Sequence, residues 1–439
     1  MSPFLPTASP LPKLWGSATA AHQVEGNNRN NDWWGWETEG GVKHHSGAAC
    51  DHWNRFHEDF DLIQKLGHSA YRFSIEWSRL EPREGEWDEA AASRYGEMLA
   101  DLRRRGIEPI VTLHHFTNPV WFARKGGWLA ETAVDDFTAF VRRAVLRFGR
   151  EVRVWITINE PVVYLSHAYY LGVWPPGHKS IDEMARVFRT MILAHVRAYR
   201  AIHEIYEIQG WGPVWVSVAK HMTYMVPSRR GSLADRFVTR LRHWFFNELF
   251  LQAVWTGFLF FPGRFCEFLP HRGALDFIGL NYYMRHRIRM VEWSQMRQFG
   301  EISLDEPPEP GVMKNVLGWE FFPKGLYKLL KKLKRMKLPI VITENGTCTE
   351  TDAERELYIR GHLEWVERAM REGVPVGGYL YWSLLDNFEW DKGFGPRFGI
   401  VEIDFETLGR KLRPSAYVLS DLCRKLFHGN FTWPPGRSF

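Results

Sequence analysis

Two stretches of the chain place a glutamate directly after a run of strand-forming residues. Arg153–Pro161 reads R-V-W-I-T-I-N-E-P, and Pro339–Asn345 reads P-I-V-I-T-E-N. β-Branched and aromatic residues favour a pleated strand, and Pro161 cannot continue the first ladder because it has no N–H. Parallel strands deliver polar groups to the rim of a sheet at the point where they end. We therefore expect Glu160 and Glu344 to face one cleft as paired carboxylates, an arrangement that serves acid–base and nucleophilic catalysis.

Two adjacent histidines after another apolar run suggest a different chemistry, a metal site. His114 and His115 follow Pro109–Leu113. Neighbouring residues on a strand point to opposite sides, so only one of the two can face a cavity. No third ligand lies at metal-binding spacing. The sequence therefore predicts no metal site here.

Eight short runs of strand type alternate with longer amphipathic patterns along the chain. The strands are predicted over Leu14–Ala18, Ala70–Ile75, Pro109–Leu113, Val154–Ile158, Val214–Ala219, Phe277–Asn281, Ile340–Thr343 and Gly378–Trp382. The helices between them are predicted over Trp53–Leu66, Ala90–Arg105, Ala133–Phe148, Met184–Tyr206, Leu233–Thr256 and Glu354–Glu372. This alternation predicts an α/β fold, a single-domain (β/α)8 TIM barrel with loop insertions over residues 1–439, of which 1–12 form an extended N-terminal segment. A doubly wound sheet is the main alternative, but we find no glycine-rich phosphate loop at its first turn.

The composition is that of a soluble globular protein. Of 439 residues, 45% are apolar and 24% are charged, and the net charge of +5 is a small excess on 56 basic and 51 acidic side chains. We therefore expect no nucleic-acid partner, and no apolar stretch approaches membrane length. The basic stretch Lys324–Lys337 carries leucines at helical spacing and predicts an outer helix. The four scattered cysteines and an N-terminus without a charged n-region predict a cytoplasmic protein.

Further motifs lie at the ends of the other predicted strands. They are L-W-G-S-A-T-A-A-H-Q-V-E-G (Leu14–Gly26), Y-R-F-S-I-E-W-S-R (Tyr71–Arg79), L-H-H-F-T-N-P (Leu113–Pro119), L-N-Y-Y (Leu280–Tyr283) and Y-W-S-L-L-D-N-F-E-W (Tyr381–Trp390). Together with T-I-N-E-P and I-T-E-N-G, they make the chain strongly resemble glycoside hydrolase family 1 from about Trp15 to about Pro414. This is the β-glucosidase family of retaining enzymes on a (β/α)8 barrel.

The resemblance implies a role for each carboxylate. Glu160 matches the acid/base of the family and Glu344 its nucleophile. One carboxyl must be protonated to release the glycosidic oxygen, while the other must be ionised to attack the anomeric carbon. The resemblance further implies that Arg72 holds Glu344 ionised, that Tyr283 donates a second hydrogen bond to it, and that Asn159 contacts the sugar 2-hydroxyl. We expect the charge on Glu344 to raise the pKa of Glu160.

Six further positions match, or are expected to join, those that bind the nonreducing sugar: Gln23, His115, Asn281, Trp382, Glu389 and Trp390. Two residues narrow the substrate class. The presence of Glu160 favours ordinary O-glycosides over thioglucosides, and the carboxylate of Glu389 would repel a 6-phosphosugar. Residues 221–256 follow the family only weakly, so we expect that segment to govern aglycone preference, and Trp174 is a further candidate on the aglycone side.

The resemblance thus implies a retaining, exo-acting β-glycosidase, foremost a β-glucosidase that also accepts β-galactosides or β-fucosides. Double displacement through a covalent glycosyl-enzyme would act on small β-glycosides or cello-oligosaccharides. Side chains supply both proton transfer and attack, so no metal or organic cofactor is expected, and no membrane partner either. Two alternatives are a transglycosylase of the same family and a catalytically inactive carbohydrate-binding barrel. Retention of both glutamates with Arg72 and Tyr283 argues against the second.

Overall fold

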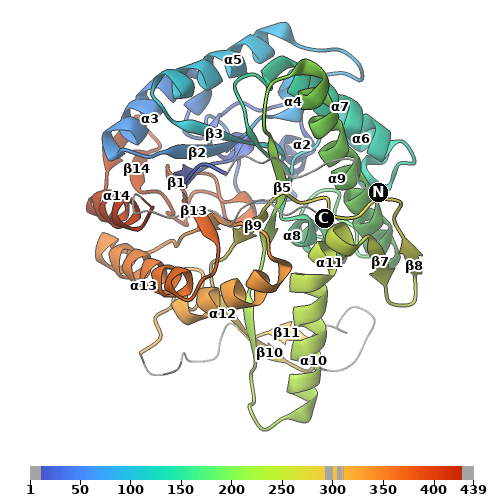
Figure 1. The fold of residues 1–439 in the computed structure, drawn as a ribbon, viewed down its shortest axis with the longest axis vertical. Helices are drawn as coiled ribbons and strands as arrows, with labels where there is room; N and C mark the ends of the chain where they lie inside the picture. The colour runs from blue at the N-terminus through green and yellow to red at the C-terminus, as the bar shows by residue number, and fades with distance from the viewer. Residues whose placement is uncertain (1–10, 292–299, 304–308, 310, 428–439) are drawn as a thin grey trace.

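The computed structural model describes residues 11–291, 300–303, 309 and 311–427. Residues 1–10 of the predicted N-terminal segment lie outside the described residues, as does most of the proline-dense stretch 304–310. Eight parallel strands close into a barrel in the order β1-β13-β12-β9-β5-β4-β3-β2, ringed by helices (Figure 1). The predicted (β/α)8 barrel is therefore confirmed.

The barrel strands begin and end close to the predicted bounds. They are β1 (Leu14–Ala18), β2 (Ala70–Ser74), β3 (Glu108–His114), β4 (Val154–Asn159), β5 (Trp215–His221), β9 (Ile278–Asn281), β12 (Ile340–Asn345) and β13 (Val376–Trp382). Each is buried on both faces because one side fills the barrel and the other packs under helices. In β4, for example, Val154 and Ile156 join the interior cluster, whereas Trp155 joins the cluster beneath the helices and donates to the Tyr206 hydroxyl at 3.0 Å.

The outer ring consists of α3 (His52–Leu66), α5 (Glu89–Arg104), α7 (Ala133–Phe148), α9 (Ile181–Gln209), α11 (Leu249–Thr256), α12 (Pro323–Leu333), α13 (Asp352–Arg371) and α14 (Pro414–Phe427). The predicted helix Leu233–Thr256 is corrected in one respect. It is α10 (Leu233–His243) followed by a π-helical turn at Trp244–Glu248 and then α11. In α12 the leucines are buried, as its spacing predicted.

Short elements decorate the carboxyl-terminal side of the barrel strands. They include the helices α1 (Ala21–Val24), α2 (Asp32–Thr38), α4 (Trp77–Leu80), α6 (Val120–Arg124) and α8 (Pro161–Leu165), and the hairpins β7–β8 (Phe258–Phe261 with Phe265–Phe268) and β14–β15 (Val401–Asp404 with Gly409–Leu412). A small sheet joins β6 (Tyr224–Pro227), β10 (Arg285–Arg289) and β11 (Glu301–Ile302). Beside α10 it extends away from the barrel (Figure 1). Within the described residues, no helix has the length and apolarity needed to cross a membrane.

Candidate active site

The two glutamates lie at the same end of the barrel, where β4 and β12 finish. The register of β4 against β5 shifts between Ile156 and Asn159, and that of β12 against β9 shifts between Ile342 and Glu344. Such irregularities re-aim the side chains that follow them. Glu160 has a left-handed backbone, with φ of 41°, and caps α8. A non-glycine residue pays a conformational cost there, which is a frequent property of functional positions.

Glu344 is buried and held by two donors. Arg72 Nη1 donates to Oε1 at 2.6 Å, and the Tyr283 hydroxyl donates to Oε2. Arg72 is itself fully buried; its Nη1 also donates to Thr343 O at 3.2 Å, and its Nε donates to Thr112 Oγ1 at 3.0 Å. The structure therefore brings Arg72, Tyr283 and Glu344 together as the sequence predicted.

Glu160 is also buried, and its two donors share one oxygen. Asn281 Nδ2 donates to Oε1 at 2.8 Å, and His221 Nδ1 donates to the same atom at 3.1 Å. The sequence had indicated Asn281 only as a sugar contact, and His221 was missed. The signal available for His221 was its position as the last residue of β5, equivalent to that of the other site residues on their strands.

Asn159 and Asn281 join the two carboxylates into one hydrogen-bonded network. Arg72 Nη2 donates to Asn159 Oδ1 at 2.7 Å, and Asn281 Nδ2 lies 3.3 Å from the same oxygen. The path from Glu344 therefore runs through Arg72, Asn159 and Asn281 to Glu160. Both carboxylates belong to a single buried compartment at the mouth of the barrel.

The pKa of Glu160 is lowered, whereas the sequence predicted that it would be raised. Burial raises the pKa of Glu344 to about 7, with Arg72 opposing and the charge on Glu160 adding to the rise. For Glu160, burial also favours the neutral form, but His221, Asn281 and Lys220 outweigh it and lower the pKa below its usual 4.5. In the sugar-free site the pair thus shares one proton near neutral pH.

Gln23 and Glu389 lie side by side, close enough to Glu344 and Glu160 for the charges of these carboxylates to act on Glu389. Gln23 Nε2 donates to Phe388 O at 2.8 Å and to Glu389 Oε2 at 3.3 Å. The Oε1 atom of Gln23 is buried without a hydrogen-bond partner in the described part of the chain. Burial, followed by the charges of Glu344, Asp391 and Glu160, raises the pKa of Glu389 to about 8. The pKa of Glu389 therefore depends on the charges of both Glu344 and Glu160.

Aromatic rings form one wall of the cleft. The His115 ring is nearly parallel to Trp382 (centroids 5.9 Å apart, 17°) and to Trp390 (6.2 Å, 15°). Asn159 Nδ2 donates to His115 Nε2 at 3.1 Å, and burial holds the pKa of His115 well below its usual range. His114 faces the other way and packs edge-on against Trp128 at 5.2 Å, as strand alternation predicted. Among the described residues no His, Cys, Asp and Glu cluster could hold a metal ion.

Trp174, the candidate for the aglycone side, is buried behind this wall. Its Nε1 donates to Asp391 at 3.0 Å, and its ring packs against Trp33 at 5.5 Å. The aromatic layer continues with Trp33 against Trp390 at 4.8 Å and His22 stacked on Trp390 at 5.8 Å. The end of the cleft beside Gln23 and Glu389 is thus backed by a thick aromatic layer.

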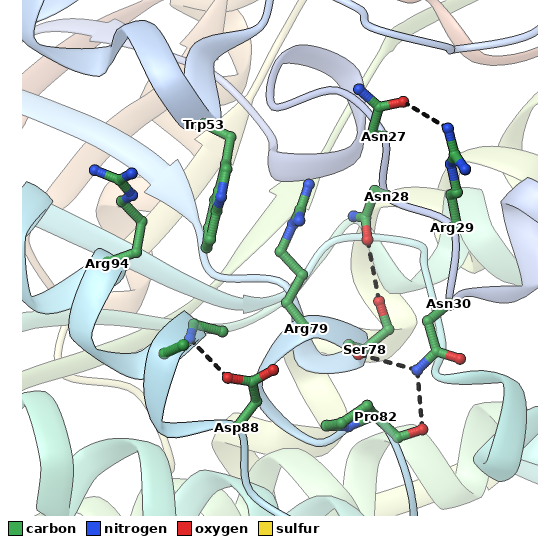
Figure 2. A pocket seen from close by; sticks show the side chains of 12 residues that line it. Asn27, Asn28, Arg29, Asn30, Trp53, Ser78, Arg79, Pro82, Asp88 and Arg94 are labelled. Atoms are coloured by element: carbon green, nitrogen blue, oxygen red, sulfur yellow. Dashed lines mark hydrogen bonds between the residues drawn. The ribbon is translucent and has the colours of Figure 1, made fainter.

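A separate cavity of about 490 Å³ lies between the loop after α1 and the start of α5 (Figure 2). Its lining includes Arg79, whose Nε donates to Glu25 at 2.7 Å and whose guanidinium lies 4.3 Å over the Trp53 ring. Ser78 Oγ donates to Asn28 Oδ1, and Asn30 Nδ2 donates to Ser78 O and to Pro82 O, as Figure 2 shows. None of the predicted site residues lines this cavity, so it is distinct from the carboxylate cleft.

Known proteins resemble this chain along most of its length. The model of glycosyl hydrolase family 1 matches residues 8–426. Beta-glucosidase A of Thermotoga maritima is 34% identical over 94% of this chain and 96% of its own length, and beta-glucosidase A of Acetivibrio thermocellus is 31% identical over 92% and 95%. A solved beta-glycosidase from Pyrococcus horikoshii superposes with a TM-score of 0.87 at 39% identity over 96% of each chain. The T. maritima beta-glucosidase in complex with glucoimidazole gives 0.85 at 31% identity over 95% of this chain and 99% of that one.

Proposed function

The chain belongs to glycosyl hydrolase family 1 and is a glycoside hydrolase, and from this premise we propose that it is a retaining, exo-acting β-glucosidase. The observation that carries the proposal is the network that joins Glu344, held by Arg72 and Tyr283, to Glu160, held by Asn281 and His221. Relatives named β-glucosidase support glucosides as the substrate class. We include β-galactosides and β-fucosides as poorer substrates.

In the first step, Glu344 attacks the anomeric carbon of the terminal sugar as the bond to the leaving oxygen breaks. Glu160 delivers its proton to that oxygen, so the aglycone departs as a neutral alcohol. In the second step, Glu160 takes a proton from water, and the resulting hydroxide displaces Glu344 from the sugar. Two inversions at one carbon give net retention. Side chains supply every group, so the proposal includes no metal or organic cofactor.

The first step requires the shared proton on Glu160 and an ionised Glu344, an effect of substrate binding on the pair. We assign this effect to the sugar 2-hydroxyl, bound by Asn159 and donating to Glu344. Together with Arg72 and Tyr283 it would give Glu344 a third donor, which lowers the pKa of a carboxyl. The proton is then favoured on Glu160, where the leaving group needs it.

The nonreducing sugar is assigned to the closed end of the cleft. Gln23 Oε1 is a buried acceptor without a partner in the described residues, and it would accept from a sugar hydroxyl. Glu389 would bind a neighbouring hydroxyl, while Trp382 offers a stacking face and Trp390 part of the wall. His22 and Trp33 pack against Trp390 at that end, and we propose that this aromatic layer stops a second sugar there. This supports exo action.

A pair of variants tests the two roles. We expect Glu344→Gly to abolish hydrolysis, and added azide to restore turnover with formation of the α-glycosyl azide. Glu160→Ala should lower kcat/KM for cellobiose by about 10²- to 10⁴-fold, the usual contribution of general acid catalysis. It should affect 2,4-dinitrophenyl β-glucoside far less, since that leaving group departs without a proton.

The exposed carboxylate substitution Glu97→Ala on α5 is the matched control and should leave both rates unchanged. A β-glycosyl azide from the Glu344 variant, or equal losses on both substrates for Glu160→Ala, would contradict the assignment. A folded protein that binds glucose without turnover would indicate an inactive binding barrel. Alkyl glucoside formation accelerated by added alcohol would indicate a transglycosylase. A panel of p-nitrophenyl sugars then ranks glucose, galactose and fucose.

We also propose a cytoplasmic location. The cysteines Cys50, Cys266, Cys348 and Cys423 are free thiols, which fits a reducing compartment. Fractionation of the source cells, with activity on p-nitrophenyl β-glucoside as the marker, tests this. Activity recovered outside the cytosolic fraction would contradict it.

A further inference from the structure

Both hydrogen bonds to the Glu160 carboxyl end on the same oxygen. Asn281 Nδ2 lies 2.8 Å and His221 Nδ1 lies 3.1 Å from Oε1. A carboxyl that gives up a proton must carry it on an oxygen that is not already accepting two hydrogen bonds. The geometry therefore leaves Oε2 as the oxygen that carries the transferable proton.

The sheet register places the two donors beside each other. β5 and β9 pair in parallel with His221 opposite Asn281. The Glu160 amide donates to Ala219 O at 2.8 Å, which holds the end of β4 against β5. β5 and β9 therefore place the His221 imidazole and the Asn281 amide at the same level of the barrel, next to the Glu160 carboxyl that follows β4. This arrangement depends on the barrel itself and not on a loop.

The His221 ring has little freedom to turn away. It stacks on Tyr283 (centroids 5.6 Å apart, 27°) and meets the Phe246 ring edge-on at 5.6 Å (80°). Its carbonyl accepts from the fully buried Lys220 Nζ at 2.5 Å. Tyr283 in turn donates to Glu344, so His221 lies against the partners of both carboxylates.

We propose that His221 is a positioning residue for the reaction, which holds Glu160 by Oε1 so that Oε2 faces the departing oxygen. The inference rests on the proposed function, in which Glu160 is the acid. Because a carboxylate oxygen only accepts, the hydrogen must lie on Nδ1. His221 touches neither the sugar nor the reacting atoms in this account and acts only through Glu160.

His221 also belongs to a group of basic side chains near Glu160. Lys220 precedes it on β5. Burial, followed by the charges of Arg242 on α10 and of His221, lowers the pKa of His286 on β10 to about 3. The charges of His221 and Lys220 both lower the pKa of Glu160. On the other side, Glu344 and Tyr283 are the titratable neighbours, and Asn281 is the uncharged one.

Two substitutions separate positioning from charge. His221→Leu removes the donor and the charge. His221→Asn removes the charge but keeps an amide N–H near the place of Nδ1. We expect His221→Leu to lower kcat/KM for cellobiose by about 10- to 100-fold, as for loss of a hydrogen bond to a charged group, and to change that for 2,4-dinitrophenyl β-glucoside by less than about threefold.

We expect His221→Asn to recover most of the cellobiose activity, because it keeps a donor near the place of Nδ1. Equal losses on both substrates in His221→Leu, or no loss on either, would overturn the proposal. So would a His221→Asn variant that recovers nothing. Thermal unfolding identifies a His221→Leu sample that has not folded, in which case the rates of His221→Asn on the two substrates decide.

Glu160→Ala, measured on the same two substrates, distinguishes a failure of the positioning role of His221 from a failure of the proposed function. A leaving-group split in Glu160→Ala without one in folded His221→Leu would refute the positioning role and leave the function intact. The absence of a split in Glu160→Ala itself would refute both.

Discussion

At the scale of single residues, the site is built around a proton shared by two buried carboxyls. Neither Glu160 nor Glu344 has the pKa of an isolated glutamate, because burial, Arg72 and His221 act on the pair together. Activity should require one proton on the pair. Two protons would neutralise the nucleophile, and none would leave no acid for the departing oxygen.

The pH profile follows from these directions. We expect a bell-shaped dependence of kcat/KM on cellobiose, with the alkaline limb at about pH 7, where the pair loses its shared proton. The acidic limb should lie below 4.5, because the pKa of Glu160 is lowered and the pair takes its second proton only there. Initial rates from pH 3 to pH 10 measure both limbs. A profile that is flat from pH 6 to pH 9 would contradict the shared proton.

Glu389 offers a residue-scale prediction about stability. Its pKa rises from the usual 4.5 to about 8 in the fold, so its charged form is disfavoured there. The stability it contributes is complete below its unfolded pKa and is lost as pH rises through the folded value. Glu389→Gln should therefore be more stable than the wild type at pH 9, by about 3–5 kcal/mol, and similar to it at pH 4. Thermal unfolding at both pH values measures the difference.

The same substitution should weaken activity, because the glutamine cannot accept from sugar hydroxyls with both of its polar groups. We expect kcat/KM for p-nitrophenyl β-glucoside to fall by about 10-fold, as for loss of one hydrogen bond to the sugar. A variant that is no more stable at pH 9, or one that keeps full activity, would contradict the place given to Glu389.

The contacts of Arg72 and Tyr283 with Glu344 could be predicted at this scale because their motifs are specific. T-I-N-E-P and I-T-E-N-G mark the two glutamates, and the structure places Arg72 and Tyr283 on Glu344 as expected. His221 could not be predicted, since it lies in a segment that follows the family weakly and a histidine after a strand has many uses. The proton balance could not be predicted either, because Lys220, His221 and Asn281 approach Glu160 only through the fold.

At the scale of elements, the strand ends hold the site and glycines set their spacing. Gly346 directly follows β12, and a Cβ at this position would lie 1.7 Å from Trp382 O and 2.7 Å from Trp382 C at the end of β13. Both contacts are with backbone, so no side-chain rotation can relieve them. The ends of β12 and β13 can approach this closely only with glycine at position 346.

Gly346→Ala should therefore push Glu344 and Trp382 apart. We expect a loss of kcat/KM on p-nitrophenyl β-glucoside of at least about 10²-fold, since small displacements of reacting groups cost about that much, together with a lower melting temperature. Gly96→Ala is the control. It lies inside α5, where an added Cβ meets only Arg147 atoms at 3.9 Å, and alanine in a helix interior should stabilise by about 0.5–1 kcal/mol. An active Gly346→Ala enzyme would contradict this account of the strand ends.

The barrel strands were predictable because β-branched runs that are apolar on both faces end in polar motifs. The added sheet was not. β10 reads R-H-R-I-R, and its charges are explained only by partners distant in sequence, such as Glu320, which accepts from Arg285 at 2.5 Å. The π-helical turn within Leu233–Thr256 could not be predicted either, because the apolar spacing continues through Trp244–Glu248.

At the scale of the whole molecule, the first and last strands of the barrel are paired with each other. β1 pairs with β13, with Leu14 opposite Gly378, and this pairing closes the barrel. Arg410 on β15 donates to the buried Asp59 of α3 at 3.0 Å, 351 residues away in sequence. We propose that residues 11–427 unfold as one cooperative domain.

Arg410→Met tests this proposal. Removing one partner of a buried ion pair costs about 3–5 kcal/mol, because the other charge stays buried. His52 still donates to Asp59 at 2.7 Å, so the lower end of that range is expected. Calorimetry should show one transition in the wild type and one at lower temperature in the variant, with loss of activity coinciding with each. A second transition in either protein would contradict a single domain.

The measurement that tests the central claim most directly is identification of the residue that carries the sugar in the trapped intermediate. With 2,4-dinitrophenyl 2-deoxy-2-fluoro-β-D-glucoside, the good leaving group allows the first step while fluorine slows hydrolysis in the second. We predict a mass increase of one fluoroglucosyl group, located by peptide sequencing on Glu344. A label on Glu160 or Glu389, or continued turnover with no label, would contradict the account.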